Sequence, residues 1–455
     1  MTANADTTPK SGFTRSTFGL DAMLPRVSHG QGSWIFDSTG KRYLDGSGGP
    51  AVYAIGHANP EVNEAVRAQM DRIAHGYRYL FTSQAADDLA EILSDVSGGQ
   101  FNNGVLVSSG SEAVESCLKI ALQYHTARGY TRRRRFIARE RSYHGNTLGA
   151  LSVSGFATRR ASFEGALIPT SFVSAANDYR RPDNVSREGL VAWLANQLEE
   201  EILAQGPDTI AAFIFEPVVG AAGGVVPAPA GYAQAMAEIC RRYGILVIAD
   251  EVMCGSGRTG HWIAHHEDGI RADITSIAKG LAAGYIPMGA ALYSDQVAEV
   301  LRGHGGVQSG HTFTGHTAGC AAAVAVQRII ARDGLMERVR TRGPQLRAEI
   351  ATALSDIPEV GDVRGRGYFI GVEIVADAQT RTPFPQHLMA HALIGRLAFE
   401  RGLIIYPCAG NVDGKSGDTL VVAPPYNATE DELAYLVETL SAALHEALPV
   451  LRASV

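Results

Sequence analysis

The sequence has few cysteines and no long apolar run, and both absences restrict the class of protein. Five cysteines, an odd number scattered over 455 residues, argue against a disulfide framework and for a reducing compartment. No pair of them has the spacing of metal ligands, so we expect no metal site. No stretch is apolar for long enough to span a membrane, and the polar first residues lack the apolar core of a secretory signal. We therefore expect a cytoplasmic protein that neither binds metal nor enters a membrane.

An excess of positive charge is also missing. The formal net charge is −7, and the arginine run at 132–135 is most simply a solvated surface patch, so nothing indicates nucleic-acid binding. Hydrophobic residues make up 45% and charged residues 19% of the chain, as in folded globular proteins. A chain of 455 residues exceeds what one simple core holds, which indicates two packed regions or one large domain with an appendage.

Short apolar segments alternate with longer helical stretches from about residue 80 to residue 335. Because the apolar segments are apolar on both faces, they predict strands of a parallel sheet that is covered on both sides. These strand candidates lie at 104–109, 135–140, 210–216 and 245–251. The stretches between them predict helices, for example at 111–127 and 231–243.

The two ends of the chain follow a different pattern. Residues 1–75 mix short β-like pieces with turn residues and predict an irregular N-terminal segment. After residue 335, helices alternate with β-like pieces such as "GYFIGVEIV", which is typical of a smaller α+β region. We therefore expect an α/β protein with a large domain at 76–335 and a small domain at 336–455 that the segment 1–75 joins.

A turn of small residues, Ser109-Gly110-Ser111, separates a predicted strand from a predicted helix. Such a turn leaves backbone N–H groups at a helix N-terminus, where the helix dipole favours an anion such as phosphate. A plain serine N-cap explains the same residues and is the commoner arrangement.

Two further residues have the chemistry of an active site. Asp250 ends an apolar strand, and ligands of open α/β sheets bind at the carboxyl ends of strands. Lys279 lies among small and apolar residues in "SIAKGLAAGY", and loss of hydration there would lower the pKa of its amine. Alone, Asp250 could also be a helix cap and Lys279 a surface lysine.

The three features together indicate one cofactor, pyridoxal phosphate. It needs an anion site for its phosphate, a carboxylate that keeps its pyridine nitrogen protonated, and a lysine that holds its aldehyde carbon as an imine. No other common cofactor needs all three.

Ordered motifs along most of the chain resemble a known family. They include "SSGSEAVE", "RSYHGNT", "FEPVVGAAGG", "IADEVMCGSGRTG", "IAKGLAAGYIPMGA" and "HTFTGHTAG". The chain resembles the class III pyridoxal-phosphate aminotransferases of fold type I, the omega-amine and 4-aminobutyrate group. That resemblance implies a large domain with a mostly parallel sheet covered by helices, and a smaller α+β domain built from both termini.

The resemblance assigns roles to individual residues. Lys279 is similar to the lysine that forms the Schiff base, and Asp250 to the acid paired with the pyridine nitrogen. Tyr143 and Val252 are similar to the residues on the two faces of the cofactor ring. The remaining cofactor positions that it implies are Ser109, Gly110, Ser111, His144, Glu216 and Thr312. Thr312 matches a threonine that reaches the phosphate of the neighbouring subunit, which implies a homodimer, or a tetramer of such dimers.

The chain departs from the family where the substrate is expected. Many relatives that use 2-oxoglutarate carry a Glu–Arg switch pair, and this chain has Ala221 and Val421 at the two positions. Tyr406 stands near the place where omega-amine relatives have a mobile arginine, and Met253 stands where many have glutamine. Because both members of the switch are missing, pyruvate is favoured over 2-oxoglutarate as the acceptor.

A keto-acid carboxylate buried without a cation is costly, so another group must pair with it. Arg78 in "GYRYLFTS" is our hypothesis for that group, with Tyr79 beside it, although a surface arginine stacked on tyrosine explains it equally well. The expected activity is ping-pong transamination between an amine donor and a keto acid. The alternatives are an epimerase or decarboxylase with the same cofactor, and an α/β regulatory protein that has lost catalysis.

Overall fold

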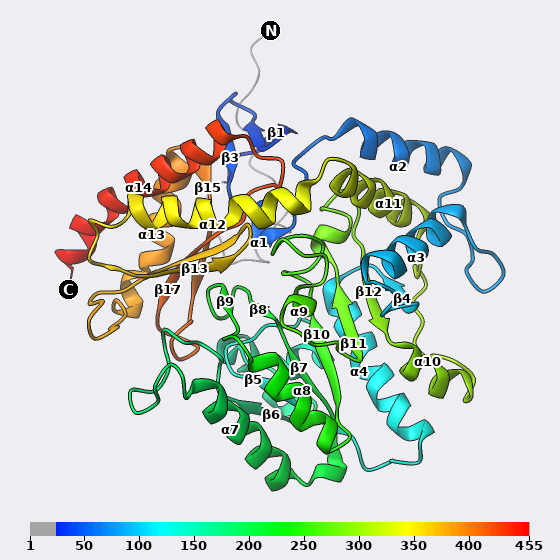
Figure 1. Cartoon of the computed structure of the whole chain (residues 1–455). Coiled ribbons are helices and arrows are strands. Elements are labelled where there is room, and N and C mark those ends of the chain that lie inside the picture. Colours follow the sequence, from blue (N-terminus) through cyan, green and yellow to red (C-terminus); the bar gives the residue numbers. More distant parts are fainter. Residues whose placement is uncertain (1–23, 455) are drawn as a thin grey trace.

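The computed structural model describes residues 24–454, and a seven-stranded sheet lies at the centre of this part of the chain (Figure 1). Its strands, in spatial order, are β4 (Asn103–Val107), β12 (Gly289–Tyr293), β11 (Ile274–Ile277), β10 (Leu246–Asp250), β7 (Ile210–Phe215), β5 (Arg135–Arg139) and β6 (Thr170–Val173). All of them run parallel except β12, which is antiparallel to both of its neighbours. The mostly parallel sheet and the four predicted strands are confirmed.

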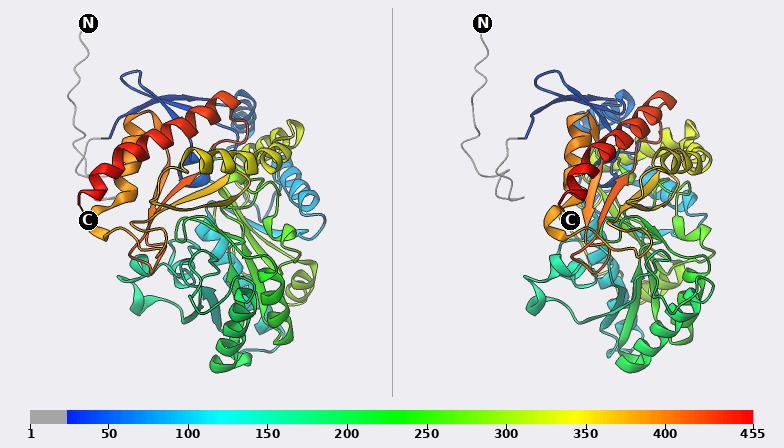
Figure 2. Two further views of the ribbon diagram at one scale, coloured as in Figure 1. Left: turned by 60° about the vertical axis from the view of Figure 1, so that its left-hand side comes forward. Right: turned by 90° about the vertical axis from the view of Figure 1, so that its left-hand side faces the viewer.

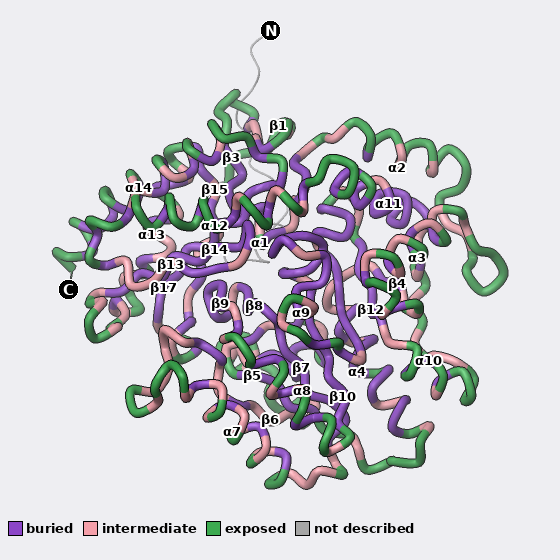
Figure 3. The backbone as a smooth tube through the Cα atoms, in the orientation of Figure 1, coloured by how far each residue is buried: buried purple, intermediate pink, exposed green. Residues whose placement is uncertain are grey.

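Helices cover both faces of this sheet because its strands are apolar on both faces. In β5, Phe136 packs into the core below α4 (Gly110–Ala127), whereas Ile137 packs into the core below α7 (Leu190–Gln205) and α8 (Tyr232–Arg242). Successive side chains of a strand point to opposite faces, so each strand supplies both cores. Figure 3 shows the central strands as buried along most of their length.

A smaller region packs beside the large sheet. Its antiparallel sheet has the order β13 (Val360–Arg366), β14 (Phe369–Ile374), β17 (Asp418–Val422) and β16 (Tyr406–Ala409). It packs with α12 (Leu335–Ala353), α13 (Ala390–Glu400) and α14 (Glu430–Arg452). Figure 2 shows α12 and α14, in yellow and red, side by side over this sheet.

The two ends of the described chain meet in another sheet. Here β1 (Val27–Gln31), β2 (Trp34–Asp37) and β3 (Arg42–Asp45) form a meander, and β15 (Leu403–Ile404) pairs in parallel with β3. The N-terminal segment therefore contacts the C-terminal region directly. The division into 1–75, 76–335 and 336–455 stays a prediction, and residues 1–23 of its first part lie outside the described residues.

The N-terminal segment is more regular than its sequence suggested. Helix α2 (Pro60–Arg72) begins at Asn59, whose side chain accepts hydrogen bonds from the N–H groups of Glu61 and Val62, and Pro60 fits the first helical turn. The prediction of an irregular segment was wrong here. Helices α2 and α3 (Gln84–Val96) both pack on α11 (Thr317–Arg332), so contacts with the large region hold them in place.

The other elements are short connectors. They are α1 (Gly48–Ala51), α5 (Leu148–Ser152), α6 (Ala157–Arg160), β8 (Val218–Val219), β9 (Val226–Pro227), α9 (Ala264–Glu267) and α10 (Asp295–Arg302), with 3₁₀ turns at Glu164–Ala166, Pro207–Thr209, Lys279–Leu281 and Gln386–Leu388. Within residues 24–454, no helix is both long and apolar enough to cross a bilayer.

Candidate active site

A cavity of about 300 Å³ opens at the carboxyl ends of the parallel strands. Five strands of the sheet, β4, β5, β7, β10 and β11, end beside it, and each chain segment that follows contributes lining residues. Parallel strands bring residues that are far apart in the sequence to one edge of a sheet, and ligands of such sheets bind there. The volume lies at the lower end of the range of about 300–1,000 Å³ for ligand cavities.

Lys279 lines this cavity and is the second residue after the end of strand β11. Its backbone has φ = 44°, in the left-handed region that a non-glycine residue adopts only at a cost of order 1 kcal/mol. Burial lowers the pKa of Lys279 to about 8, against the opposing effect of the carboxylates of Asp250 and Glu216. The strained turn therefore presents an amine that is half deprotonated at about pH 8, well below the pH at which an ordinary lysine loses its proton.

Asp250, the last residue of β10, is held in place by several hydrogen bonds. Its Oδ2 accepts from Nδ1 of His144 at 2.7 Å, and its Oδ1 accepts from the Ser276 hydroxyl at 2.9 Å and the Val252 N–H at 3.0 Å. The side chain is 3% exposed. A carboxylate with this many donors stays fixed in one orientation toward the cavity.

Glu216 brings a second carboxylate to the same cavity. Its Oε1 accepts the N–H of Tyr143 and its Oε2 accepts the N–H of Gly220, both at 3.0 Å. Burial raises the pKa of Glu216, and the nearby charge of Asp250 acts in the same direction. Glu216 therefore fixes the backbone of Tyr143, whose side chain also lines the cavity.

The N-terminus of α4 forms the end of the cavity that suits an anion. The Ser109 hydroxyl accepts the N–H of Glu112 at 3.1 Å, so this serine is the N-cap of the helix, and it also lines the cavity together with Gly110 and Ser111. A Cβ on residue 110 would lie 2.9 Å from a methyl group of Val252, so glycine lets Val252 approach this turn. The first N–H groups and the dipole of an 18-residue helix thus face the cavity.

Four predicted site residues do not line the cavity of their own chain, and three of them, Arg78, Tyr79 and Thr312, lie near one loop. Thr312 is exposed in the loop before α11. Arg78 lies against the same loop, since its Cδ is 3.2 Å from the position of a Cβ on Gly315, and the Tyr79 hydroxyl approaches Gly310 in the same way. Arg78, Tyr79 and Thr312 therefore form one surface region.

Tyr406, the fourth of these residues, packs against an apolar cluster. It pairs with Val421 on the neighbouring strand, and both pack with Ala221, Met253 and Cys408. Burial raises the pKa of Tyr406 to about 12. The two positions of the missing switch pair, 221 and 421, thus belong to one apolar wall.

Several lining residues were assigned no role from the sequence. Val52, Ser108, Ile286, Pro287 and Met288 all line the cavity. The last four lie within motifs that carry the family resemblance, but their side chains offer no chemistry that the sequence alone would single out. Another residue that was missed is Arg159, whose guanidinium carbon lies 5.3 Å from the centre of the Tyr143 ring. Nothing in "GFATRRAS" distinguishes this arginine from its neighbour.

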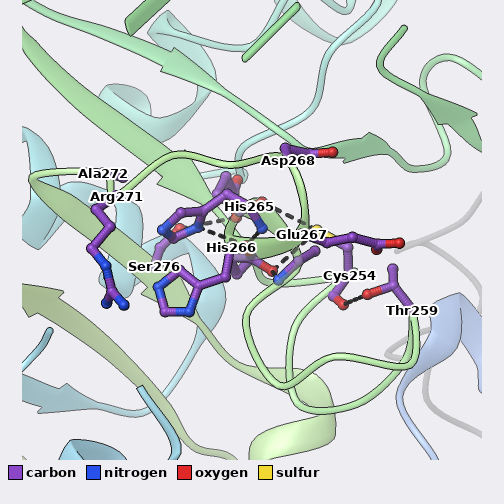
Figure 4. Close-up of polar contacts among 12 residues, drawn as sticks. Cys254, Thr259, His265, His266, Glu267, Asp268, Arg271, Ala272 and Ser276 are labelled. Carbon is purple, nitrogen blue, oxygen red and sulfur yellow. Dashed lines mark hydrogen bonds and ion pairs between the residues drawn. The ribbon is translucent and has the colours of Figure 1, made fainter. Parts of the chain in front are cut away.

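Buried hydrogen bonds of Glu251, the residue after Asp250, support the loop that follows it. The Glu251 carboxylate accepts the N–H groups of Ala264 and His265 at 3.0 and 2.9 Å, and His265 Nδ1 lies 2.9 Å from it. Although burial opposes it, these donors hold the pKa of Glu251 below its ordinary value. Figure 4 shows His265 on one side of this loop and the contact between Thr259 and Cys254 on the other. These contacts of Glu251 therefore hold in place the loop that carries Val252 and Met253.

Residues 18–444 match the family model of the class III aminotransferases, and the chain belongs to this family. It is 39% identical to an uncharacterized aminotransferase of Bacillus subtilis (strain 168), YodT, over 93% of this chain and 95% of that protein. The fold is fold type I, and the protein is a pyridoxal-phosphate-dependent aminotransferase.

Solved transaminases have the same structure. A thermostable (S)-enantioselective omega-transaminase from Thermomicrobium roseum superposes with a TM-score of 0.88 at 34% identity, covering 98% of this chain and 97% of that one. An amine transaminase from an uncultivated Pseudomonas species, in its PLP-bound form, superposes with a TM-score of 0.89 at 33% identity, covering 94% of this chain and 98% of that one.

The cavity fits this cofactor. An anion site at the start of α4, the fixed carboxylate of Asp250 and the amine of Lys279 line one space. His144 also lines the cavity, and its buried Nε2 has no hydrogen-bond partner within residues 24–454. A bound ligand could supply that partner. These are the groups that pyridoxal phosphate requires.

The lowered pKa of Lys279 predicts a distinct pH profile for labelling of the apoprotein. Because the free amine attacks an aldehyde and the ammonium form does not, coupling of Lys279 to pyridoxal phosphate should rise with pH and level off above about 8. Lys41, Lys119 and Lys415 are exposed and lie away from the cavity, so their labelling gives a reference profile for surface amines.

Timed labelling from about pH 6 to about pH 10, followed by borohydride reduction and peptide mass analysis, measures all four lysines in one sample. The three exposed lysines are the internal control. A profile of Lys279 that coincides with theirs would show that its amine is as well hydrated as an ordinary surface amine.

Proposed function

We propose that this aminotransferase moves an amino group from an amine or omega-amino acid to a keto acid, with pyruvate preferred over 2-oxoglutarate. The observation that carries the proposal is the cavity in which Lys279, Asp250 and the start of α4 meet beside an apolar wall. The first three groups suit the cofactor, and the wall suits an uncharged donor. Ping-pong order follows, because one cavity must serve the donor and the acceptor in turn.

The cofactor residues act as follows in this proposal. Ser109, Gly110 and Ser111 bind the phosphate at the helix N-terminus, while Tyr143 and Val252 contact the two faces of the ring. Asp250, oriented by His144, holds a proton on the pyridine nitrogen, and Glu216 lies near the ring hydroxyl. When bound, the cofactor supplies an electron sink for the bond-breaking step.

Lys279 has two tasks. Its amine would hold the cofactor at rest. Once free, Nζ would act as the general base that takes the proton from the amine-bearing carbon of the donor, and as the general acid that returns a proton. A pKa of about 8 suits an amine that must both accept and release a proton near neutral pH.

Pyruvate is preferred because of the wall that includes Ala221 and Val421. Met253 belongs to this apolar cluster and lines the cavity, so a second carboxylate placed against it, as in 2-oxoglutarate, would lose hydration without an ionic partner. Pyruvate, with a methyl group in that place, meets no such cost. Tyr406 lies in the same wall and would contact the arm of the substrate.

A panel of amines, diamines and omega-amino acids with pyruvate and with 2-oxoglutarate tests the proposal, with the carbonyl product measured. We expect turnover with pyruvate and parallel double-reciprocal plots when both substrates are varied. Faster turnover with 2-oxoglutarate would refute the acceptor preference, and turnover of one substrate without any acceptor would refute transamination.

We also propose a homodimer whose two cavities are completed across the interface. Thr312, Arg78 and Tyr79 lie outside the cavity of their own chain, in a region where the aromatic side chains of Tyr77, Tyr79, Phe81 and Phe313 are 56–77% exposed. Large exposed apolar patches mark interfaces. In the dimer, Thr312 of each subunit reaches the phosphate bound by the other, with Arg78 and Tyr79 near the substrate entrance.

Replacing Thr312 with alanine should weaken pyridoxal phosphate binding about tenfold, because a hydroxyl donor to a charged phosphate is lost. Equilibrium titration of the apoprotein measures this, and sedimentation velocity should give twice the mass of one chain. Thr341→Ala, at an exposed helical position, is the control and should leave the affinity unchanged. A monomer with full cofactor affinity would rule out shared sites.

We place the protein in the cytoplasm. All five cysteines lie within the described residues and are buried, unpaired thiols, as is usual in a reducing compartment.

A further inference from the structure

We propose that the guanidinium of Arg159 binds the carboxylate of the acid substrate at the edge of the cavity. The inference rests on the transamination proposed above and deepens it, because it names the cation that the missing switch pair does not supply.

Aromatic rings hold Arg159 beside the cavity. The residue lies in the short helix α6, and its Cζ is 5.3 Å from the ring centre of Tyr143 and 5.3 Å from that of Phe156. These two rings meet edge to face, with centres 6.5 Å apart. A guanidinium stacks well on aromatic faces and keeps its N–H groups free at the edge. Tyr143 lines the cavity, so Arg159, which does not line it, is separated from it by no more than this ring.

Arg159 has no ion pair within residues 24–454, which distinguishes it from the arginine next to it. Arg160 donates hydrogen bonds to the carbonyl groups of Leu151, Ser152 and Ser154 and pairs with Glu164. Arg160 thus closes the end of helix α5, whereas Arg159 offers five N–H donors without a carboxylate acceptor. Arg160 is therefore occupied by structural contacts, whereas the guanidinium of Arg159 is available to a ligand.

The cavity itself offers little else to a carboxylate. Apart from Lys279, which the cofactor engages, its lining within the described chain contains no lysine or arginine. The wall made by Ala221, Met253 and Val421 is apolar. A carboxylate bound in such surroundings needs a cation.

The charge of Arg159 reaches the substrate side of the site. It lowers the pKa of Tyr143 and of Tyr406, against the larger effect of burial in each case. The charge of Arg159 also acts to lower the pKa of Cys408, which lies in the same strand as Tyr406, although burial raises it. The charge of Arg159 therefore acts both on a residue that lines the cavity, Tyr143, and on two residues of the apolar cluster, Tyr406 and Cys408. A substrate carboxylate beside the Tyr143 ring would meet this charge.

Arg78 is the competing candidate, and the structure favours Arg159. Arg78 lies beside Gly315, outside the cavity of its own chain, and could act only in the neighbouring subunit. Arg159 needs no second chain, because Tyr143 of its own chain positions it.

The test compares acceptors that do and do not carry a carboxylate. The cofactor in the holoenzyme is first converted to its amine form with a carboxylate-free amine, and single-turnover reoxidation is then followed with pyruvate or with butanal. Arg159→Ala should raise the half-saturating concentration of pyruvate about 10- to 100-fold, because a charge-assisted contact is lost, and should change that of butanal less than about twofold. Arg159→Lys should restore part of the loss for pyruvate.

A binding measurement gives a second readout that does not depend on turnover. Calorimetric titration of the holoenzyme with propionate should show about 10- to 100-fold weaker binding in Arg159→Ala, with the uncharged propionamide unaffected. Arg42→Ala is the matched control, since Arg42 is also an exposed arginine stacked on an aromatic ring, Trp34, away from the cavity.

The possible outcomes are distinct. Equal losses with pyruvate and butanal would mean that Arg159 only supports Tyr143, and a pyruvate-specific loss in Arg78→Ala but not in Arg159→Ala would assign the carboxylate to Arg78. Either result overturns the inference while transamination stands. A wild-type protein that converts no amine refutes transamination itself, and the inference with it.

Discussion

Replacing Lys279 with alanine should reduce the rate of transamination at least about a thousandfold, because covalent attachment of the cofactor and proton transfer are lost together. Pyridoxal phosphate should still bind, since the start of α4 and the Asp250 carboxylate remain. Stopped-flow spectroscopy of the half-reaction with the preferred amine measures the rate, and dialysis equilibrium measures the retained cofactor.

Lys119→Ala is the matched control for this substitution. Lys119 is exposed on helix α4, whose N-terminus contributes to the same cavity, so its loss should leave rate and cofactor content unchanged. Borohydride reduction of the wild-type holoenzyme should place a pyridoxyl group on Lys279. A Lys279→Ala variant that retains wild-type turnover, or an adduct found only at another lysine, contradicts the assigned role.

Replacing Asp250 with asparagine should slow the reaction about 100- to 1,000-fold, the usual cost of removing one group that stabilises charge in the transition state. An amide has nearly the same shape and can still accept from Ser276 and Val252, but it carries no charge to hold a proton on the pyridine nitrogen. The half-reaction rate and the visible absorption spectrum of the holoenzyme measure the effect.

Asp273→Asn is the control that distinguishes an effect on catalysis from an effect on folding. Asp273 lies at the opposite end of the same sheet, where its carboxylate accepts the N–H of Val247, and burial raises the pKa of Asp273. This variant should keep its rate within about threefold, and thermal unfolding should show that both variants remain folded. If Asp250→Asn retains its rate, or loses it only because the protein unfolds, the carboxylate is not part of the chemistry.

The sequence was sufficient wherever the signal is local. Strand β10 is a continuous apolar run that ends in Asp250, and α4 begins with a serine cap, so both the elements and their order could be predicted. Helix α2 was missed although its signal was present, since an asparagine cap before a proline at the first helical position is local too. The helix was not predicted because most of its surface is exposed and it has few apolar residues to show a helical period.

Strand direction and side-chain neighbours are not local properties. Nothing in Gly289–Tyr293 says that β12 runs antiparallel, because direction depends on how the preceding connection packs. Likewise, no sequence feature separates Arg159 from Arg160. Only the fold places the former on the ring of Tyr143 and the latter on the carbonyl groups at the end of α5.

The sequence by itself determined the family, the cofactor and the types of side chain in the site, because strand ends, helix starts and lysine environments are encoded within a few residues. Tertiary structure decided which of those side chains share one cavity. It joined positions 221 and 421 in an apolar wall, left Arg78 and Thr312 at the surface, and placed Arg159 against the ring of Tyr143. The reason is that contacts between distant segments depend on how whole strands and helices pack, and this packing is a property of the complete fold.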